Sequence, residues 1–217
     1  MYNPKHFEQD DMTVVSALIK HFPLGALVTV QNGGLEADHL PFMLVGDLTS
    51  PGSKLIGHVA KNNPVWQRAS ADDECMVIFQ GPSAYISPNW YPSKQVHHEV
   101  VPTYNYAVAH VYGRLTISHD PQTKLEVVDH LTAMMEAGRK APWGVLDAPA
   151  SYIDNRLKEI VAIELTVTRV QAKWKISQNR EDRDRLGAAK GLASEASSPT
   201  APHMARMVEA KTGIGQP

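Results

Sequence analysis

One long segment, residues 101–118, constrains the fold more than any other part of the sequence. Within it, β-branched and aromatic side chains recur at every second position through Tyr104, Tyr106, Val108, His110 and Tyr112. Because successive side chains of a strand point to opposite faces of a sheet, this period of two predicts a strand. The segment is long enough that we expect the strand to be interrupted or bulged. β-structure is therefore expected at the centre of the fold.

Shorter segments rich in β-branched residues are separated by turns of Gly, Pro and Asn, which predicts further strands. We expect them at residues 26–30, 35–45, 54–59 and 75–81, with the first two joined as a hairpin by Asn32-Gly33-Gly34, and one or two strands over 159–177. Helices do not separate the strands regularly, so a doubly wound parallel sheet is not expected. The pattern instead predicts a mainly β fold with helical inserts (α+β), built as a closed or half-closed antiparallel barrel.

Helices are expected as inserts and near the C-terminal end of the chain. Asp10 or Asp11 can cap a first helix that Pro23 ends, and Pro121 opens a second with apolar residues at helical spacing. Shorter helices are expected after Pro64, over 151–158, over 182–192 and, for a last turn or two, over 205–211, with a loop at 194–202. We expect residues 1–179 to form one barrel domain and residues 180–217 a partly flexible helical extension.

Composition and charge exclude several classes of protein. Apolar residues make up 43% and charged residues 20% of the 217, as in ordinary globular proteins. The single cysteine, Cys75, cannot form an internal disulfide, and neither a membrane-spanning segment nor a secretory leader is visible, so a cytoplasmic location is expected. The net charge is -2, divided as -6 over residues 1–155 and +4 over residues 156–217. Direct DNA binding is therefore doubtful and would have to involve the C-terminal third.

Four segments carry polar groups that plain strands do not need. Pro41 forfeits a strand hydrogen bond and so marks an edge or a bulge, where freed backbone groups can face a planar ligand. Lys61 precedes a short helix capped by Asn62 or Asn63, an arrangement that suits an anion. The passages 81–92 and 101–106 offer aromatic, hydroxyl and amide groups for a heteroaromatic ring. Each segment also has a purely structural interpretation, as a strand kink, a surface lysine or loop packing.

Neither a metal site nor a catalytic nucleophile is predicted. Adjacent histidines such as His97 and His98 point to opposite faces of an extended chain, so they cannot easily share one ion. No residue lies in a recognisable nucleophile turn, and the apolar neighbours of Cys75 indicate a buried thiol.

Taken together and in order, the segments resemble the PaiB family, the FMN-binding negative transcriptional regulators. The resemblance covers residues 1 to about 179. The segments that carry it are Met1-Tyr2-Asn3-Pro4-Lys5-His6-Phe7, His39-Leu40-Pro41-Phe42, Gly57-His58-Val59-Ala60-Lys61-Asn62-Asn63-Pro64, Gly81-Pro82 with Tyr85-Ile86-Ser87-Pro88-Asn89-Trp90-Tyr91, Val101-Pro102-Thr103-Tyr104-Asn105-Tyr106, and Lys173-Trp174-Lys175-Ile176-Ser177-Gln178-Asn179-Arg180. Tyr104 stands where the family's Pro-Thr-Trp-Asn-Tyr stretch has tryptophan, and it keeps an aromatic ring there.

The resemblance implies a split antiparallel β-barrel of the FMN-binding, pyridoxamine-phosphate-oxidase-like type, assembled as a homodimer with two flavins at the interface. It also implies a set of FMN contacts by position. These are His39, Leu40 and Pro41 along the isoalloxazine; His58, Lys61 and Asn62 at the phosphate; Ser87, Thr103 and Asn105 at the ring edge or ribityl chain; and Lys175, Ser177 and Gln178 reaching in from the last strand, within the subunit or across the dimer.

Three functions are open at this point. The first is a dimer that binds FMN and acts as a negative regulator of transcription, which the resemblance favours. The second is an FMN-dependent oxidoreductase that uses NAD(P)H or oxygen, for which the candidate acids or bases are His39, His58, Tyr85 and Tyr104. The third is a haem-binding or haem-degrading protein, because split barrels also occur among such proteins.

Overall fold

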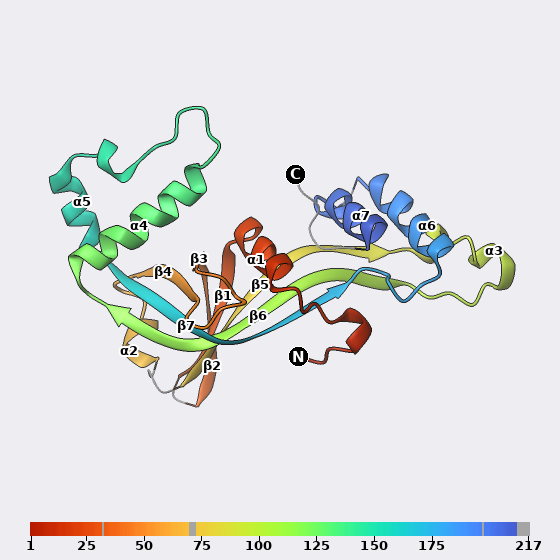
Figure 1. The fold of residues 1–217 in the computed structure, drawn as a ribbon, viewed down its shortest axis with the longest axis horizontal. Helices are drawn as coiled ribbons and strands as arrows, with labels where there is room; N and C mark the ends of the chain where they lie inside the picture. Colours follow the sequence, from red (N-terminus) through yellow and green to blue (C-terminus); the bar gives the residue numbers. More distant parts are fainter. Residues whose placement is uncertain (32, 70–72, 197, 212–217) are drawn as a thin grey trace. The chain divides into compact units, whose positions relative to one another are not determined.

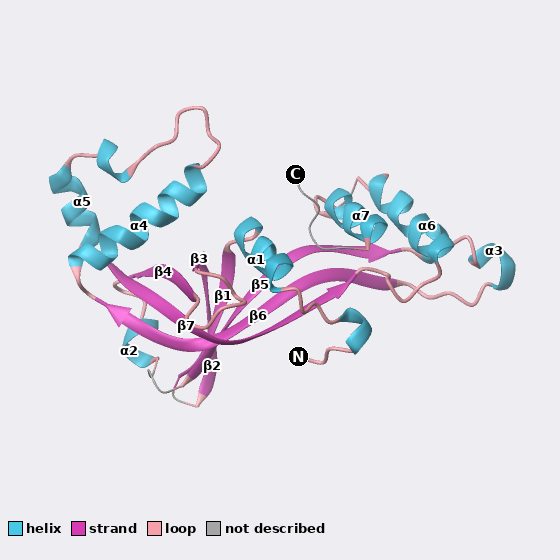
Figure 2. Ribbon diagram, viewed as in Figure 1, coloured by secondary structure: helices cyan, strands magenta, loops and turns pink. Residues whose placement is uncertain are grey.

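The strands of the protein form one curled sheet. A computed structural model describes residues 1–31, 33–69, 73–196 and 198–211. Within these residues the sheet has seven strands in the order β2-β1-β5-β6-β7-β4-β3 (Figures 1 and 2). The pairings of β1 with β2 and β5, and of β4 with β3 and β7, are antiparallel. A half-barrel of antiparallel strands with helices confirms the predicted split-barrel fold.

The elements have the following bounds. The strands are β1 (Leu24–Gln31), β2 (Gly34–Pro41), β3 (Met43–Val45), β4 (Lys54–Ala60), β5 (Glu74–Ile86), β6 (Thr103–Ser118) and β7 (Ile160–Lys175). The helices are α1 (Met12–His21), α2 (Val65–Arg68), α3 (Lys94–His97), α4 (Pro121–Glu136), α5 (Ala150–Leu157), α6 (Asp182–Ala193) and α7 (Ala201–Ala210), with the short 3-10 segments η1 (Lys5–Phe7), η2 (Pro88–Trp90) and η3 (Val145–Asp147). No helix in the described part of the chain is both long and apolar enough to cross a membrane.

The chain divides into two compact units. Unit 1 contains Met1–Leu18, Gln80–Ala109 and Gln171–Pro217, and unit 2 contains Ile19–Phe79 and His110–Val170. Strands β5, β6 and β7 each contribute residues to both units. The boundary expected at residue 179 is a different division and stays a prediction, and residues 212–217 of the expected extension lie outside the described residues.

Strand β6 confirms the long strand predicted from alternation, but it runs from Thr103 to Ser118 without the expected interruption. Its buried positions alternate through Asn105, Ala107 and Val111, whereas the large alternating side chains that predicted the strand are only partly buried or exposed. At Gly113 a Cβ atom would lie 2.3 Å from the carbonyl oxygen of Thr166 on β7. Glycine is therefore needed where the backbones of β6 and β7 approach each other.

In unit 2, α4 packs against β3 and β4 (Figure 1). The buried side chains of this contact are Ile56, Val127, Leu131 and Ala162, with Met43 and Met134 beside them. Asp120 caps α4 by accepting a 2.8 Å hydrogen bond from the backbone N–H of Thr123. The buried ammonium of Lys124 donates a 2.7 Å hydrogen bond to the carbonyl of Leu157, which ties the end of α5 to α4.

Two predicted strands have different bounds in the structure. The strand expected over 35–45 is two strands, because β2 ends at Pro41 and β3 pairs with β4 instead of β1. The strand expected over 75–81 continues through Pro82 to Ile86. Pro82 is tolerated because the described pairing of β1 with β5 covers only Met76–Ile78. Beyond it, the hydroxyl of Thr200 bonds the backbone N–H and carbonyl of Ser83 at 3.4 and 2.6 Å.

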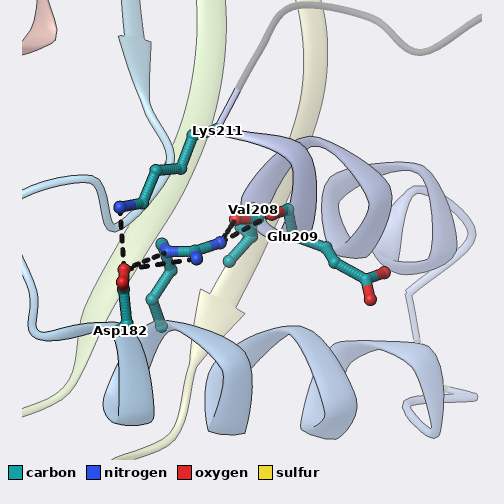
Figure 3. Close-up of polar contacts among 5 residues, drawn as sticks. Asp182, Val208, Glu209 and Lys211 are labelled. Carbon is teal, nitrogen blue, oxygen red and sulfur yellow. Dashed lines mark hydrogen bonds and ion pairs between the residues drawn. The ribbon is translucent and has the colours of Figure 1, made fainter.

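In unit 1, α6 and α7 lie side by side (Figures 1 and 2). The guanidinium of the buried Arg185 on α6 donates to the carbonyls of Val208 and Glu209 at 2.6 and 2.7 Å, in the last turn of α7 (Figure 3). The carboxylate of Asp182 pairs with Arg185 at 3.3 Å and with Lys211 at 2.7 Å. The helix predicted over 182–192 is confirmed, and α7 begins four residues before the predicted 205–211 turn because a proline fits the first turn of a helix.

Candidate functional site

The turn between β4 and α2 carries Lys61 and Asn62, and both side chains are exposed. Asn63 fixes this turn, because its Oδ1 accepts a 2.8 Å hydrogen bond from the backbone N–H of Val65 and its Nδ2 donates a 2.6 Å bond to Asp38 on β2. Helix α2 has only four residues, so it adds little of the dipole that the sequence suggested. The attraction of this turn for an anion therefore rests mainly on the ammonium of Lys61.

His58 and Pro41 line one cavity of about 300 Å³, whose other walls come from α4 and Trp143. Their approach depends on Gly57, where a Cβ atom would lie 3.1 Å from the carbonyl oxygen of Pro41. The buried Nδ1 of His58 has no hydrogen-bond partner among the described residues. Burial lowers the pKa of His58, so its imidazole is neutral at pH 7 and can donate or accept a hydrogen bond.

The remaining predicted residues of unit 2 lie on β2. This strand ends the sheet, which confirms that Pro41 marks an edge. His39 is exposed and pairs with Ala26 of β1, whereas Leu40 and Pro41 are partly buried. The edge strand therefore brings Pro41 to the cavity at His58, whereas the side chain of Leu40 points to the opposite face of the sheet.

Five predicted residues of unit 1 lie at the start of β6, at the end of β7 and in the turn that follows β7. Asn105 is fully buried, and its Nδ2 donates a 2.9 Å hydrogen bond to the hydroxyl of Ser177. The ammonium of Lys175 donates to the hydroxyl of Thr103. Gln178 closes a turn by accepting a 2.7 Å bond from the backbone N–H of Ile176. The structure thus brings these side chains into two hydrogen-bonded pairs and one turn.

Ser87 takes part in neither of these pairs; it caps η2, where its hydroxyl accepts a 3.2 Å hydrogen bond from the backbone N–H of Asn89. The geometry expected for the neighbouring histidines was wrong. His97 ends α3 and His98 has a left-handed backbone with φ of 57°, so the pair is not extended.

Sequence reasoning missed a second group around His58, contributed by the segment from α4 to α5. Trp143, Tyr152 and Arg156 line a cavity of about 260 Å³ that also includes His58. Two signals in the sequence could have found them. Tryptophan in the loop Ala141-Pro142-Trp143-Gly144 has no strand or helix to bury it, and Tyr152 and Arg156 share one helix face at a spacing of four.

The side chains of unit 2 fit a flavin mononucleotide in chemistry. A phosphate requires a cation, and the ammonium of Lys61 is exposed in a turn that its neighbours hold in place. A planar ring requires apolar or aromatic walls with a few polar groups, and the cavity lined by Pro41, Trp143 and Thr132 offers both.

Comparison with known proteins agrees with this fit. A family described as "Putative FMN-binding domain" matches residues 1–169. The protease synthase and sporulation protein PAI 2 of Bacillus subtilis is 33% identical over 216 residues, which cover 97% of this chain and 98% of that protein.

Solved structures support the fold. The FAD- and haem-binding protein from Mycobacterium smegmatis has a TM-score of 0.56 at 19% identity, covering 77% of this chain and 73% of that one. A flavocytochrome from Azotobacter vinelandii has a TM-score of 0.55 at 14% identity, covering 77% and 69%. The family match and the relative of nearly equal length go further than fold: the chain belongs to the PaiB family of FMN-binding split-barrel proteins, and FMN is its cofactor.

Proposed function

We propose that this chain is a homodimeric, FMN-binding negative regulator of transcription of the PaiB type. The observation that carries the proposal is the 33% identity to PAI 2, which extends over 97% of this chain and so includes the C-terminal helices as well as the sheet. The name of that relative refers to protease synthase and to sporulation, and a regulator of gene expression can control both.

In this proposal the phosphate of FMN is held by His58, Lys61 and Asn62, and the ring lies along His39, Leu40 and Pro41. Two observations support this placement. No ion pair among the described residues engages Lys61, so its charge is available to a ligand. His58 and Pro41 line the same cavity of about 300 Å³. The roles of Ser87, Thr103, Asn105, Lys175, Ser177 and Gln178 at the ring and ribityl chain stay predictions.

A homodimer is supported by large apolar side chains that the single chain leaves in water. On the β1–β2 hairpin of unit 2, Leu24 is 61% and Leu35 is 75% exposed. In unit 1, Tyr85 and Tyr104 are 51% and 54% exposed. Burial of apolar surface is worth about 25 cal/mol per Å², so covering these side chains with a second copy would favour association.

The proposed regulator does not depend on strong contact with duplex DNA. A duplex-binding protein usually neutralises several phosphates with free Lys and Arg side chains. In the basic C-terminal third, Arg183 pairs with Glu181 at 2.8 Å, and both Arg185 and Lys211 pair with Asp182. These internal ion pairs reduce the charge that the helices α6 and α7 can offer to DNA.

The first experiment is a titration of purified protein with FMN, followed by flavin fluorescence, together with sizing by light scattering. A unit charge near a phosphate is worth about 1 kcal/mol in water and about 4 kcal/mol near a protein surface, so Lys61→Ala should weaken FMN binding at least about fivefold. Lys140→Ala, at an exposed lysine after α4, is the control and should leave binding unchanged. Equal FMN affinity in both variants would contradict the placement of the phosphate.

Regulation is tested separately from flavin binding. Transcript levels are compared between cells that produce the wild-type chain, the Lys61→Ala variant or no protein. A set of transcripts should be more abundant in cells without the protein than in cells with the wild-type chain. The same transcripts should also be more abundant in cells with the Lys61→Ala variant than in cells with the wild-type chain. Unchanged transcripts in all three strains would refute the regulatory role. A gel shift of duplex DNA at nanomolar protein, with a steep salt dependence, would refute regulation without strong DNA contact.

An FMN-dependent oxidoreductase is the second candidate, and one observation favours it. His58 lines a second cavity of about 260 Å³ beside the first, which leaves room for a small molecule next to the proposed ring position. Steady consumption of NAD(P)H that requires added FMN and is lost in Lys61→Ala would support this activity. Tight FMN binding with no turnover would exclude it under those conditions.

A further inference from the structure

The cavity of about 260 Å³ in unit 2 has no role in the regulatory function proposed above, and its ligand has not been named for the oxidoreductase. Helix α4 supplies Thr132, the following loop supplies Trp143, α5 supplies Tyr152, Ile153 and Arg156, and β4 supplies His58. All of these residues belong to unit 2. The volume is below the range of about 300–1,000 Å³ that is usual for drug-sized ligands, so the cavity suits a molecule with a single ring.

The walls of this cavity are apolar, with one cation at the edge. Trp143 and Tyr152 offer aromatic faces, and Ile153 offers an aliphatic one. The guanidinium of Arg156 lies 5.6 Å from the centre of the Tyr152 ring, and no ion pair within the described ranges joins it to a carboxylate. Trp143 and Tyr152 are 46% and 56% exposed, so they form the open side of the cavity. Two aromatic faces beside an unneutralised guanidinium favour a planar ligand that carries one negative charge.

His58 adds a polar residue to the lining of the cavity without adding a charge. Its Nδ1 is fully buried and has no hydrogen-bond partner among the described residues, so a ligand in the cavity meets other atoms of the ring. Burial keeps the imidazole of His58 neutral, so it adds a hydrogen-bonding group and no second charge. The site thus combines one cation with one neutral polar group, which matches a carboxylate better than a phosphate dianion.

The frame of the cavity is held by hydrogen bonds outside it. Lys124 ties the end of α5 to α4. The carboxylate of Glu136 accepts a 3.2 Å hydrogen bond from the backbone N–H of Trp143 and pairs with Arg139 at 3.2 Å. Asp147 accepts a 2.9 Å bond from the backbone N–H of Gly144. The loop and both helices are therefore positioned before any ligand arrives, which lowers the cost of binding.

We propose that this cavity binds a small aromatic carboxylate, with its ring between Trp143 and Tyr152 and its carboxylate on the guanidinium of Arg156. The proposal rests on the flavin placement above, since His58 lines both cavities and would bring this second ligand next to FMN. In the regulatory function the carboxylate is an effector, and in the oxidoreductase it is a substrate.

Benzoate is the probe, and its binding to the FMN-loaded full chain is measured by calorimetry. We expect a dissociation constant in the millimolar range or tighter, and at least tenfold weaker binding of benzamide, the neutral isostere. Arg156→Gln should weaken benzoate at least tenfold. Lys158→Gln removes an exposed charge two residues along, outside the cavity, and should change nothing. Thermal unfolding of both variants confirms that each is folded.

The FMN dissociation constant of each variant separates this proposal from the function above. Normal FMN binding without benzoate binding, or with equal benzoate binding in Arg156→Gln and the wild type, overturns the carboxylate site alone. The carboxylate site is also overturned if Arg156→Gln loses FMN binding and inorganic phosphate competes with FMN for the wild type but not for this variant. The cavity would then hold the phosphate group of FMN. Benzoate binding that depends on Arg156 in a chain that binds no FMN supports the site and refutes the flavin placement.

Discussion

The contact between Arg185 and the end of α7 gives a prediction whose size follows from the structure. One nitrogen of the buried guanidinium donates to the carbonyls of Val208 and Glu209 at 2.6 and 2.7 Å (Figure 3). Hydrogen bonds to a charged group are worth about 1.5–3 kcal/mol each, and a cation at a helix C-terminus adds about 0.3–1 kcal/mol. Because the two bonds share one nitrogen, they do not simply add. Arg185→Met should lower the free energy of unfolding by about 2–4 kcal/mol.

A second ion pair at the same place supplies the control. Lys211 and Asp182 have side chains that are 48% and 66% exposed, and such pairs are worth about 0–1 kcal/mol. Lys211→Ala should therefore cost far less than Arg185→Met. Urea unfolding followed by circular dichroism gives both values, and hydrogen exchange of the α7 amides locates the loss. If Arg185→Met cost no more than Lys211→Ala, Arg185 would not be committed to this cap, and the argument that the basic residues of α6 and α7 are used internally would fail.

Three further predictions concern unit 2. Lys124→Met leaves the carbonyl of Leu157 without its 2.7 Å partner and should cost about 1–3 kcal/mol in urea unfolding, while Lys158→Gln should cost nothing measurable. Gly113→Ala places a Cβ 2.3 Å from the carbonyl oxygen of Thr166, so the free energy of unfolding should fall by about 3 kcal/mol, seen as a lower midpoint of thermal unfolding. An unchanged midpoint would show that the backbones of β6 and β7 are not this close. Burial lowers the pKa of His58 below its unfolded value of 6.5, so the unfolded state takes up a proton first and stability should fall as the pH drops below about 6.5. His58→Gln should reduce that slope, measured as the urea midpoint against pH, and an equal slope in both proteins would contradict a buried neutral His58.

The strands could be predicted from the sequence because alternation is a local property, whereas the face that becomes buried is not. Tyr104 and Tyr106 predicted β6 correctly, yet the core side of that strand is the one with Asn105 and Ala107. The small side faces inward because neighbouring backbones approach closely there, as at Gly113. Such an approach depends on partner strands that lie far away in the sequence.

Proline caused two of the errors in element bounds, at the end of β5 and the start of α7. Pro82 suggested the end of a strand, but β5 continues past it. The described pairing of β1 with β5 stops at Ile78, so Pro82 removes no hydrogen bond to β1. The hydroxyl of Thr200 bonds the backbone N–H and carbonyl of Ser83. Pro202 suggested a loop, but it lies in the first turn of α7, where its missing N–H costs nothing. A tertiary contact decides the outcome at Pro82, and the position within the helix decides it at Pro202.

The candidate site could be predicted in part for the same reason. His58, Lys61 and Pro41 stand in segments whose local pattern is unusual, and the structure places two of them on one cavity. Trp143 and Arg156 belong to a helical insert of ordinary composition, and only the packing of α4 and α5 brings them to His58.

The central claim is that the chain holds FMN through unit 2, with Lys61 at the phosphate. The most direct test is a fluorescence titration of FMN, repeated with riboflavin, which lacks the phosphate, on the wild type and on Lys61→Ala. We expect saturable quenching with one FMN per chain, much weaker binding of riboflavin to the wild type, and similar weak binding of both flavins to Lys61→Ala. Equal affinity of the wild type for FMN and riboflavin, or no quenching at micromolar protein, would contradict it.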